Sequence, residues 1–233
     1  MRVRGVVAYD GAAFHGFAAN LGVPTVAASL DAARSRARKV PGSVICAGRT
    51  DRGVHAVGQV ISFDVPDEAD LVRLRRSVNR QCRPSVVVTM LDRAADDFDA
   101  RFSAIGRTYR YRVLNRPDAD PFTSALAWHV PGRLDVDAME AAAALLVGLH
   151  DFTSFCRLPT LRPDGTMPTL VRRVTGASWR WLEPGLRSEE RRVGKACRPR
   201  GSPDLYKKKS TQHPVLPPLP PLAPTDPLVL PVS

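Results

Sequence analysis

The N-terminal stretch Arg2-Val3-Arg4-Gly5-Val6-Val7-Ala8-Tyr9 alternates polar and apolar residues and predicts a β-strand with one buried face. Asp10-Gly11 ends this strand, because both residue types favour turns. Apolar residues at helical spacing predict two helices in the following sequence, over 25–39 and 67–82. Short apolar or alternating runs predict three further strands, over 43–47, 58–65 and 84–91.

The predicted order is therefore strand, helix, strand, strand, helix, strand. This is the split βαβ, ferredoxin-like arrangement, in which an antiparallel sheet carries both helices on one face. The other face of such a sheet is left open for binding. Sheets of this kind often bind RNA, but the fold alone does not establish the function.

A second unit begins in the same way after residue 100. Strands are predicted over 107–114, 127–130 and 170–181, and a helix over 135–147, which begins with an acidic turn and ends at Gly148. The repeat then stops. We therefore predict an α+β protein with two ferredoxin-like (βαββαβ) units and antiparallel sheets, the second unit incomplete.

The charge of the chain is strongly positive, with a formal net charge of +11 over 233 residues. Nine basic and four acidic residues follow from Arg187 onward, which leaves +6 for the preceding body. This charge fits a polyanionic partner such as nucleic acid, or equally a solvated basic surface without a partner. The sequence contains no apolar run of about 18 residues, so we expect no membrane span.

The four cysteines are scattered, and no pair has the CxxC spacing of a zinc site. No disulfide framework or metal site is expected. The N-terminus has no signal-peptide pattern and enters the first strand directly. Together these features predict a reduced, cytoplasmic setting.

One loop concentrates glycine and charge: Ala47-Gly48-Arg49-Thr50-Asp51-Arg52-Gly53-Val54-His55-Ala56-Val57-Gly58-Gln59-Val60. A turn of this composition exposes its side chains instead of packing them. Asp51 can serve there as a turn residue, as an ion-pair partner of Arg49 or as a nucleophile. A lone Asp in a loop is most often structural, and His55 equally fits a capping or packing role.

A second motif alters that balance. Asp97-Phe98-Asp99-Ala100-Arg101-Phe102-Ser103-Ala104 is followed by Arg107-Thr108-Tyr109-Arg110-Tyr111, which interleaves phenols and arginines. Aromatic rings and guanidinium groups supply stacking planes and phosphate contacts for RNA. Tyr109 and Tyr111 also share one face of the predicted strand. We therefore also expect at least one of the two rings to pack against a core.

With these residues in view, the chain resembles the tRNA pseudouridine synthase A family from Val3 to about Leu186. The resemblance lies in four ordered motifs: Tyr9-Asp10-Gly11 with Phe14-His15-Gly16-Phe17, then 47–60, 98–111 and 148–155. One departure is Phe17-Ala18, where the family commonly has Trp-Gln. The resemblance implies that Asp51 is the nucleophile, that Tyr109 stacks on the uracil and that Arg49 holds the vacated base position. Thr50, His55 and Arg107 are candidate supporting residues.

The resemblance also implies the reaction, an isomerisation of uridine to pseudouridine in the anticodon stem-loop of tRNA. A carboxylate can attack carbon and later leave, either at the base or at the sugar, and the sequence leaves both routes open. No cofactor and no metal are expected. The implied partner is the anticodon arm of tRNA, and intact family members are expected to form homodimers.

The C-terminal sequence departs from the family. The family continues with a Met-Val-Arg motif whose Arg is implied to pair with the nucleophile, and this motif does not occur here. Residues 187–195 resemble a translated sequencing adapter, and ten of the 21 prolines lie within 199–233. We therefore expect a catalytic domain at 1–100, a truncated second domain at 101–186 and a non-native or disordered tail at 187–233. Such a chain would be poorly stable with little or no activity, and a non-catalytic RNA-binding remnant is the alternative function.

Overall fold

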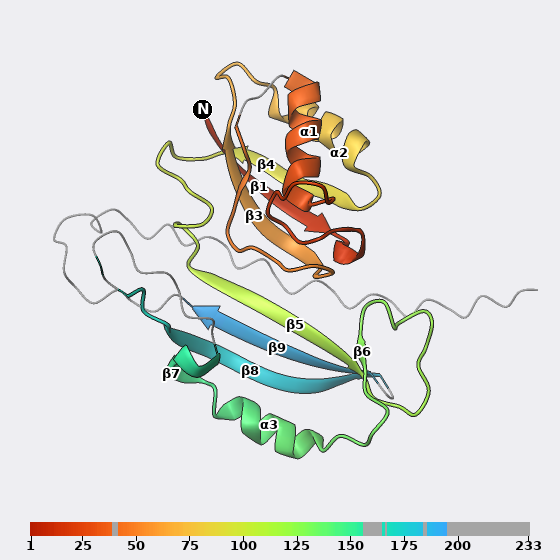
Figure 1. Cartoon of the computed structure of the whole chain (residues 1–233). Coiled ribbons are helices and arrows are strands. Elements are labelled where there is room, and N and C mark those ends of the chain that lie inside the picture. Colours follow the sequence, from red (N-terminus) through yellow and green to blue (C-terminus); the bar gives the residue numbers. More distant parts are fainter. Residues whose placement is uncertain (39–41, 156–164, 166, 184–185, 195–233) are drawn as a thin grey trace, which may run out of the picture. The chain divides into compact units, whose positions relative to one another are not determined.

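The computed structural model describes residues 1–38, 42–155, 165, 167–183 and 186–194. Within these residues the chain forms two β-sheets, the first accompanied by two α-helices and the second by one (Figure 1). Of the tail predicted at 187–233, residues 195–233 lie outside the described residues.

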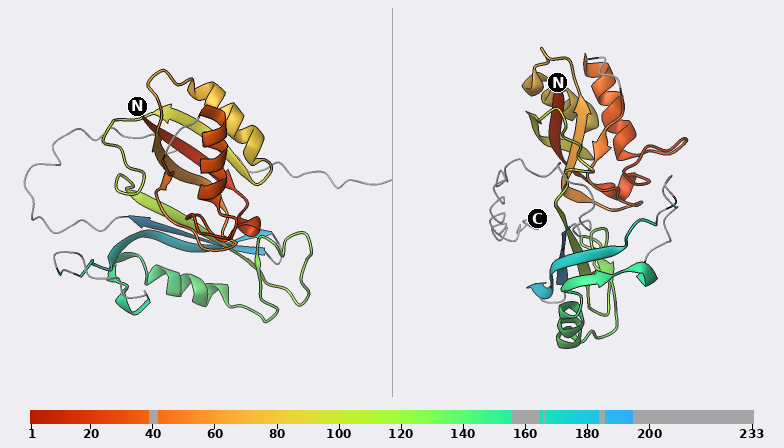
Figure 2. Two further views of the ribbon diagram at one scale, coloured as in Figure 1. Left: turned by 45° about the horizontal axis from the view of Figure 1, so that its top comes forward. Right: turned by 90° about the vertical axis from the view of Figure 1, so that its left-hand side faces the viewer.

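The N-terminal sheet contains β1 (Arg2–Tyr9), β2 (Ile45–Cys46), β3 (Ala56–Asp64) and β4 (Val86–Arg93) in the order β2-β3-β1-β4, and all neighbours are antiparallel. Helices α1 (Val26–Arg38) and α2 (Leu71–Cys82) lie side by side on one face of this sheet (Figures 1 and 2). The predicted element order is confirmed. The second helix begins later than predicted because Asp70 caps it, accepting a 2.9 Å hydrogen bond from the Arg73 amide.

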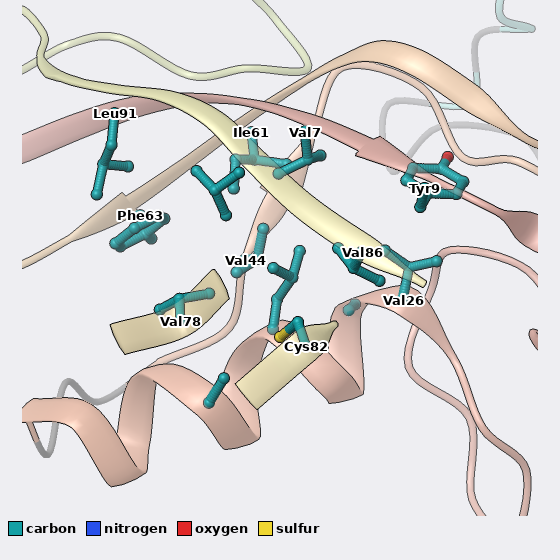
Figure 3. Packing of buried hydrophobic residues seen from close by; sticks show 14 of the residues in the cluster. Val7, Tyr9, Val26, Val44, Ile61, Phe63, Val78, Cys82, Val86 and Leu91 are labelled. Atoms are coloured by element: carbon teal, nitrogen blue, oxygen red, sulfur yellow. The ribbon is translucent and has the colours of Figure 1, made fainter. Parts of the chain in front are cut away.

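The hydrophobic core fills the space between this sheet and its two helices (Figure 3). Alternate residues of β1 point into it, as the sequence pattern predicts, while the residues between them are half-buried on the other face. The main contributors are Val3, Val7, Tyr9, Val26, Leu30, Ile61, Phe63, Leu74, Val78, Val86 and Leu91.

The helix-free face of the N-terminal sheet is not entirely open. The backbone N–H of Ala100 donates a 3.0 Å hydrogen bond to Oγ of Ser62, and both residues are buried. Ser62 lies opposite Arg4 in the sheet, on the face away from Val3 and the helices. The segment that leaves β4 therefore crosses part of the face that the sequence predicted to be free for binding.

The second sheet contains β5 (Gly106–Leu114), β6 (Trp128–His129), β7 (Gly148–Asp151), β8 (Val171–Glu183) and β9 (Leu186–Gly194) in the order β6-β5-β9-β8-β7. Helix α3 (Val136–Ala144) lies along β8 (Figure 1). The expectation of a wholly antiparallel sheet is wrong here, because β5 and β6 run parallel. Strand β9 was not predicted; it crosses the expected boundary at residue 187 and pairs with β5 and β8.

Burial differs between the two sheets. In the C-terminal part of the described chain the buried apolar residues are Val113, Leu114, Ala143 and Val174, and none belongs to the main core cluster. Large apolar side chains remain exposed there, including Trp128 at 73% and Leu145 at 78%. The N-terminal sheet therefore has the apolar burial that stabilises a fold, whereas few of the side chains whose burial is described on β5 to β8 and α3 are buried.

Two 3-10 turns complete the description, at Gly11–Ala13 and Thr153–Phe155. No helix within the described ranges has the length and apolar character needed to cross a membrane. Cys46 and Cys82 carry free thiols, and the other two cysteines lie outside the described residues.

Candidate active site

The loop that carries Asp51 connects β2 to β3 and is held by the register of these strands. Ile45 lies opposite Ser62, and the next backbone hydrogen bond runs 2.9 Å from the Ala47 amide to the Val60 carbonyl. This register brings Gly48 opposite Gln59. The Gln59 side-chain amide donates to the Gly48 carbonyl at 2.5 Å and accepts from the Gly48 N–H at 3.3 Å. Both backbone groups of Gly48 are thus fixed immediately before Arg49.

The loop is fixed on the other side of Arg49 by Tyr9. This residue ends β1, its side chain is only 4% exposed, and its hydroxyl lies 2.8 Å from Oγ1 of Thr50. Burial raises the pKa of the Tyr9 phenol above its ordinary value, although hydrogen bonds from Thr50 and Gln59 act in the opposite direction. The phenol is therefore a neutral hydrogen-bonding group that holds Thr50 next to Asp51.

The backbone of the first motif forms the support beneath the loop. The Phe17 amide donates 3.0 Å to the Thr50 carbonyl, and the Gly53 amide donates 3.3 Å to the Phe14 carbonyl. Gly16 has a φ of +98°, and a Cβ there would lie 2.7 Å from the Thr50 carbonyl oxygen. This close approach requires glycine at position 16. Gly11 packs equally closely, because a Cβ there would overlap the Val54 carbonyl.

The side chains of Asp51 and Arg49 are exposed above this support. The Asp51 carbonyl accepts a 3.2 Å hydrogen bond from the Val54 amide, and Gly53 turns the chain with a φ of +78°. The alternative of an Arg49–Asp51 ion pair does not appear among the described residues. The turn therefore presents the carboxylate of Asp51 outward, as the sequence predicted for a loop of this composition.

His55 lies at the base of the loop. Its Nδ1 is 3.2 Å from the Gly11 amide nitrogen and 3.0 Å from Oδ1 of Asp10. An unprotonated Nδ1 accepts a hydrogen bond from the Gly11 amide, whereas a protonated Nδ1 donates one to the Asp10 carboxylate. The two hydrogen bonds therefore exclude one another. In either form His55 ties the loop to the end of β1.

Three arginines lie around the start of the loop. Burial raises the pKa of the Cys46 thiol, while the positive charges of Arg49, Arg101 and Arg107 act in the opposite direction. The guanidinium of Arg107 donates a hydrogen bond to the Ala47 carbonyl, and its Nε would lie 2.8 Å from a Cβ at Gly48. The resulting cluster of positive charge favours a phosphate backbone close to Asp51.

Tyr109 and Tyr111 lie on β5 but do not pack into a core. Their side chains are 43% and 53% exposed, so the expectation that at least one ring is packed away is wrong. No hydrogen bond joins Tyr109 to Asp51 in the part of the chain that the structure describes. The structure thus brings Arg107 to the loop that carries Arg49, Thr50, Asp51 and His55, and leaves the Tyr109 side chain exposed on β5, a strand of the second sheet.

The structure adds residues whose roles the sequence did not assign. Tyr9 and Gln59 stood in the quoted motifs, but their functions depend on which backbone groups they meet. The Gly48–Gln59 contact follows from the strand register, which a single sequence does not specify. Within the described ranges, no group of three or more His, Cys, Asp or Glu side chains is arranged to hold a metal ion.

Comparison with known proteins now supplies the family. The chain is 36% identical over 198 residues to the tRNA pseudouridine synthase A of Bacillus pumilus, a match that covers 83% of this chain and 77% of that protein. The chain belongs to the tRNA pseudouridine synthase A family. The family name denotes isomerases that act on tRNA. No family model matches the chain.

Two further relatives of the family have the same name. The protein of Brevibacillus brevis is 42% identical over 177 residues, covering 76% of this chain and 70% of that protein. The protein of a Methylobacterium strain is 44% identical over 155 residues, covering 66% of this chain and 62% of the relative. The chain thus matches less than two thirds of the length of that last relative.

Proposed function

We propose that this chain is a tRNA pseudouridine synthase that uses Asp51 as its nucleophile on a uridine of the anticodon stem-loop. The observation that carries the proposal is the construction of the Asp51 loop. Side chains of Tyr9 and Gln59 and the backbone of Gly16 fix the loop from three sides, yet the carboxylate itself is exposed. A loop held this firmly around an outward carboxylate suits a group that must meet a substrate atom in a fixed geometry.

The proposed reaction conserves every atom of the substrate. The bond between ribose C1′ and uracil N1 breaks, the base rotates, a bond forms between C1′ and C5, and the proton lost from C5 is balanced by one gained at N1. The Asp51 carboxylate forms a bond to carbon, either on the uracil ring or at ribose C1′, and is later released. The first route holds the uracil covalently while it turns, and the second holds the ribose. An isomerisation of this kind needs no redox, nucleotide or metal cofactor.

The surrounding residues receive their roles from this chemistry. A uridine in a stem must leave the base stack before a carboxylate can reach it, and Arg49 is proposed to occupy the vacated position. Tyr109 stacks on the uracil and helps to remove the C5 proton. Arg107, Thr50 and His55 support the loop through the contacts described above.

We further propose that the N-terminal region is a ferredoxin-like unit. The strand order β2-β3-β1-β4 with antiparallel neighbours, and two helices on one face, is what a split βαβ arrangement produces. The division into 1–100, 101–186 and a non-native 187–233 also remains a proposal, as do the homodimer and the cytoplasmic location. Sequencing the locus from genomic DNA tests the non-native tail, and codons for 187–233 at that locus would contradict it.

A second candidate is a non-catalytic RNA-binding remnant of the same family. It is favoured by one observation: within the described residues no ion pair holds the Asp51 carboxylate. The nucleophile therefore has no cationic partner there that would orient it.

Asp51→Ala separates the two candidates. With the full chain and an anticodon stem-loop transcript, we expect Asp51→Ala to lose pseudouridine formation and to keep most of its RNA affinity. Pseudouridine is measured by liquid chromatography of nucleosides, and affinity by filter binding. A wild-type chain that binds the transcript but forms no pseudouridine would establish the remnant and overturn the enzyme.

A further inference from the structure

A tight turn at Asp99–Ser103 is closed by hydrogen bonds that involve the side chains and backbone of its two end residues. Oδ1 of Asp99 accepts from the amides of Arg101 and Phe102 at 2.8 and 2.9 Å. The turn closes again at its far end, where the Ser103 amide donates 2.7 Å to the Asp99 carbonyl and the Ser103 hydroxyl accepts 3.2 Å from the Asp99 amide. Four bonds across five residues hold this backbone in one conformation.

The turn is also fixed to the N-terminal sheet. Ala100, in the middle of the turn, is 1% exposed, and its amide donates 3.0 Å to the buried Oγ of Ser62 on β3. Ser62 lies opposite Ile45 of β2, two residues before the Asp51 loop begins at Ala47. The turn therefore shares its support with the candidate active site.

This rigid turn presents an aromatic ring at the surface. The Phe102 side chain is 68% exposed, and the guanidinium carbon of Arg101 lies 5.7 Å from its ring centroid. Such a cation–π contact orients the ring and places a positive charge beside it. A phenylalanine ring this exposed does not gain the stabilisation that burial would give. Contact between the ring and a binding partner would explain its exposure.

We infer that Arg101 and Phe102 form a stacking site for an unpaired base of the RNA substrate, beside the Asp51 loop. This inference rests on the proposed function and adds a contact that the isomerisation itself does not require. The phenyl ring supplies the plane for a base, and the guanidinium supplies charge for the adjoining phosphate. Arg101 acts on Cys46 together with Arg49 and Arg107, so the site belongs to the same cluster of positive charge.

A single exposed phenylalanine is common on protein surfaces and needs no function by itself. Phe122 provides that comparison within the same chain. It is 90% exposed, and its amide is likewise held by an Asp side chain, at 2.9 Å from Oδ1 of Asp120. It is not among the residues placed around the Asp51 loop. Phe122→Ala is therefore the matched control for Phe102→Ala.

The test measures binding of the full chain to a stem-loop RNA that carries 2-aminopurine in its loop. Loss of base–aromatic stacking predicts that Phe102→Ala weakens binding about tenfold or more, and that Phe102→Trp stays within about threefold of the wild type. Phe122→Ala leaves the affinity unchanged. Stacking also quenches the 2-aminopurine fluorescence, and Phe102→Ala removes that quenching.

Salt dependence separates the two halves of the site. Arg101→Gln lowers the slope of log affinity against log salt by about 1, because one phosphate contact is lost, whereas Phe102→Ala leaves the slope unchanged. Equal affinities and equal quenching for Phe102→Ala and Phe122→Ala would overturn the inference. If Phe102→Ala fails to fold, the Phe102→Trp chain decides, because an indole emission that RNA does not alter contradicts stacking. If Phe102→Ala forms pseudouridine normally and binds RNA with unchanged affinity, the stacking site is refuted and the proposed function still stands.

Discussion

The hydroxyl of Tyr9 lies 2.8 Å from the hydroxyl of Thr50, the residue that precedes Asp51. Tyr9 belongs to the hydrophobic core, whereas Asp51 is exposed, so this contact joins the packed interior of the N-terminal sheet to the Asp51 loop. The position of the carboxylate is thereby set by packing that lies outside the site itself.

Removing either hydroxyl of this pair should loosen the loop. We expect Tyr9→Phe and Thr50→Val each to lower the free energy of unfolding by about 1 kcal/mol, the net value of one hydrogen bond, and to lower kcat more than they raise KM. Urea unfolding and steady-state kinetics measure the two effects. Thr50→Ser retains the hydroxyl and serves as the control. Because either single substitution already removes the Tyr9–Thr50 bond, the double variant should lose less than the sum of the two single losses, and fully additive losses would contradict the contact.

Gln59 should matter for the site more than for the fold. Gln59→Leu keeps the side-chain volume but leaves the Gly48 carbonyl and N–H without partners, so Arg49 loses its fixed position. We expect at least a tenfold fall in kcat/KM for an anticodon stem-loop, equivalent to about 1.4 kcal/mol. Gln81→Leu is the matched control, since Gln81 binds the Ala33 carbonyl between the two helices and should affect stability alone. Equal kinetic effects of the two variants would refute this role.

Gly16→Ala tests the support beneath the loop. The new Cβ would combine a φ of +98° with a 2.7 Å approach to the Thr50 carbonyl, so the loop must shift. We expect a loss of about 1–3 kcal/mol in stability together with lower activity per folded molecule. Gly22→Ala has a similar φ of +78° but nothing within 4 Å, so it should carry the backbone cost alone. Thermal unfolding and kinetics of both variants separate the backbone strain from the steric conflict with the Thr50 carbonyl. A Gly16→Ala chain of normal activity would contradict the role of Gly16 in supporting the loop.

The buried Arg34 makes a prediction about stability that does not involve the site. The residue is 1% exposed, its Nη1 lies 3.3 Å from Oδ1 of Asp31, and its guanidinium carbon lies 4.1 Å from the Phe63 ring centroid. Burial lowers the pKa of Arg34 and raises that of Asp31, which indicates that desolvation dominates for both charges.

Removing one partner of this pair should cost more than removing the other. Asp31→Ala leaves a buried cation without its carboxylate and should lower stability by about 3 kcal/mol, whereas Arg34→Met places an apolar chain in the same space and should cost about 1 kcal/mol. Denaturant unfolding measures both. The reverse order of the two losses would show that the cation itself stabilises this core.

The sequence predicts the N-terminal fold well because its signals are local. The alternation in β1 and the two predicted helices both appear in the structure, although α2 starts at Leu71, after the cap Asp70, and not at residue 67 as predicted. The parallel pairing of β5 with β6 and the strand β9 depend on contacts between distant residues, which no local pattern encodes.

The candidate site divides in the same way. The composition of the loop predicts that Asp51 is exposed, and the structure places it so. The contacts of Tyr9 with Thr50 and of Gln59 with Gly48 depend on strand register and on the packing of the first motif. The role of Asp51 itself stays a prediction that chemistry must test.

The most direct measurement is the release of tritium from RNA labelled at C5 of uridine, because forming the bond from C1′ to C5 expels that hydrogen. The full chain is incubated with a labelled anticodon stem-loop, alongside Asp51→Asn, which keeps the shape of the side chain without its charge. The account predicts steady tritium release by the wild type and none above background for Asp51→Asn, at similar RNA affinity. Equal release by the two chains would contradict the assignment of Asp51 as the nucleophile.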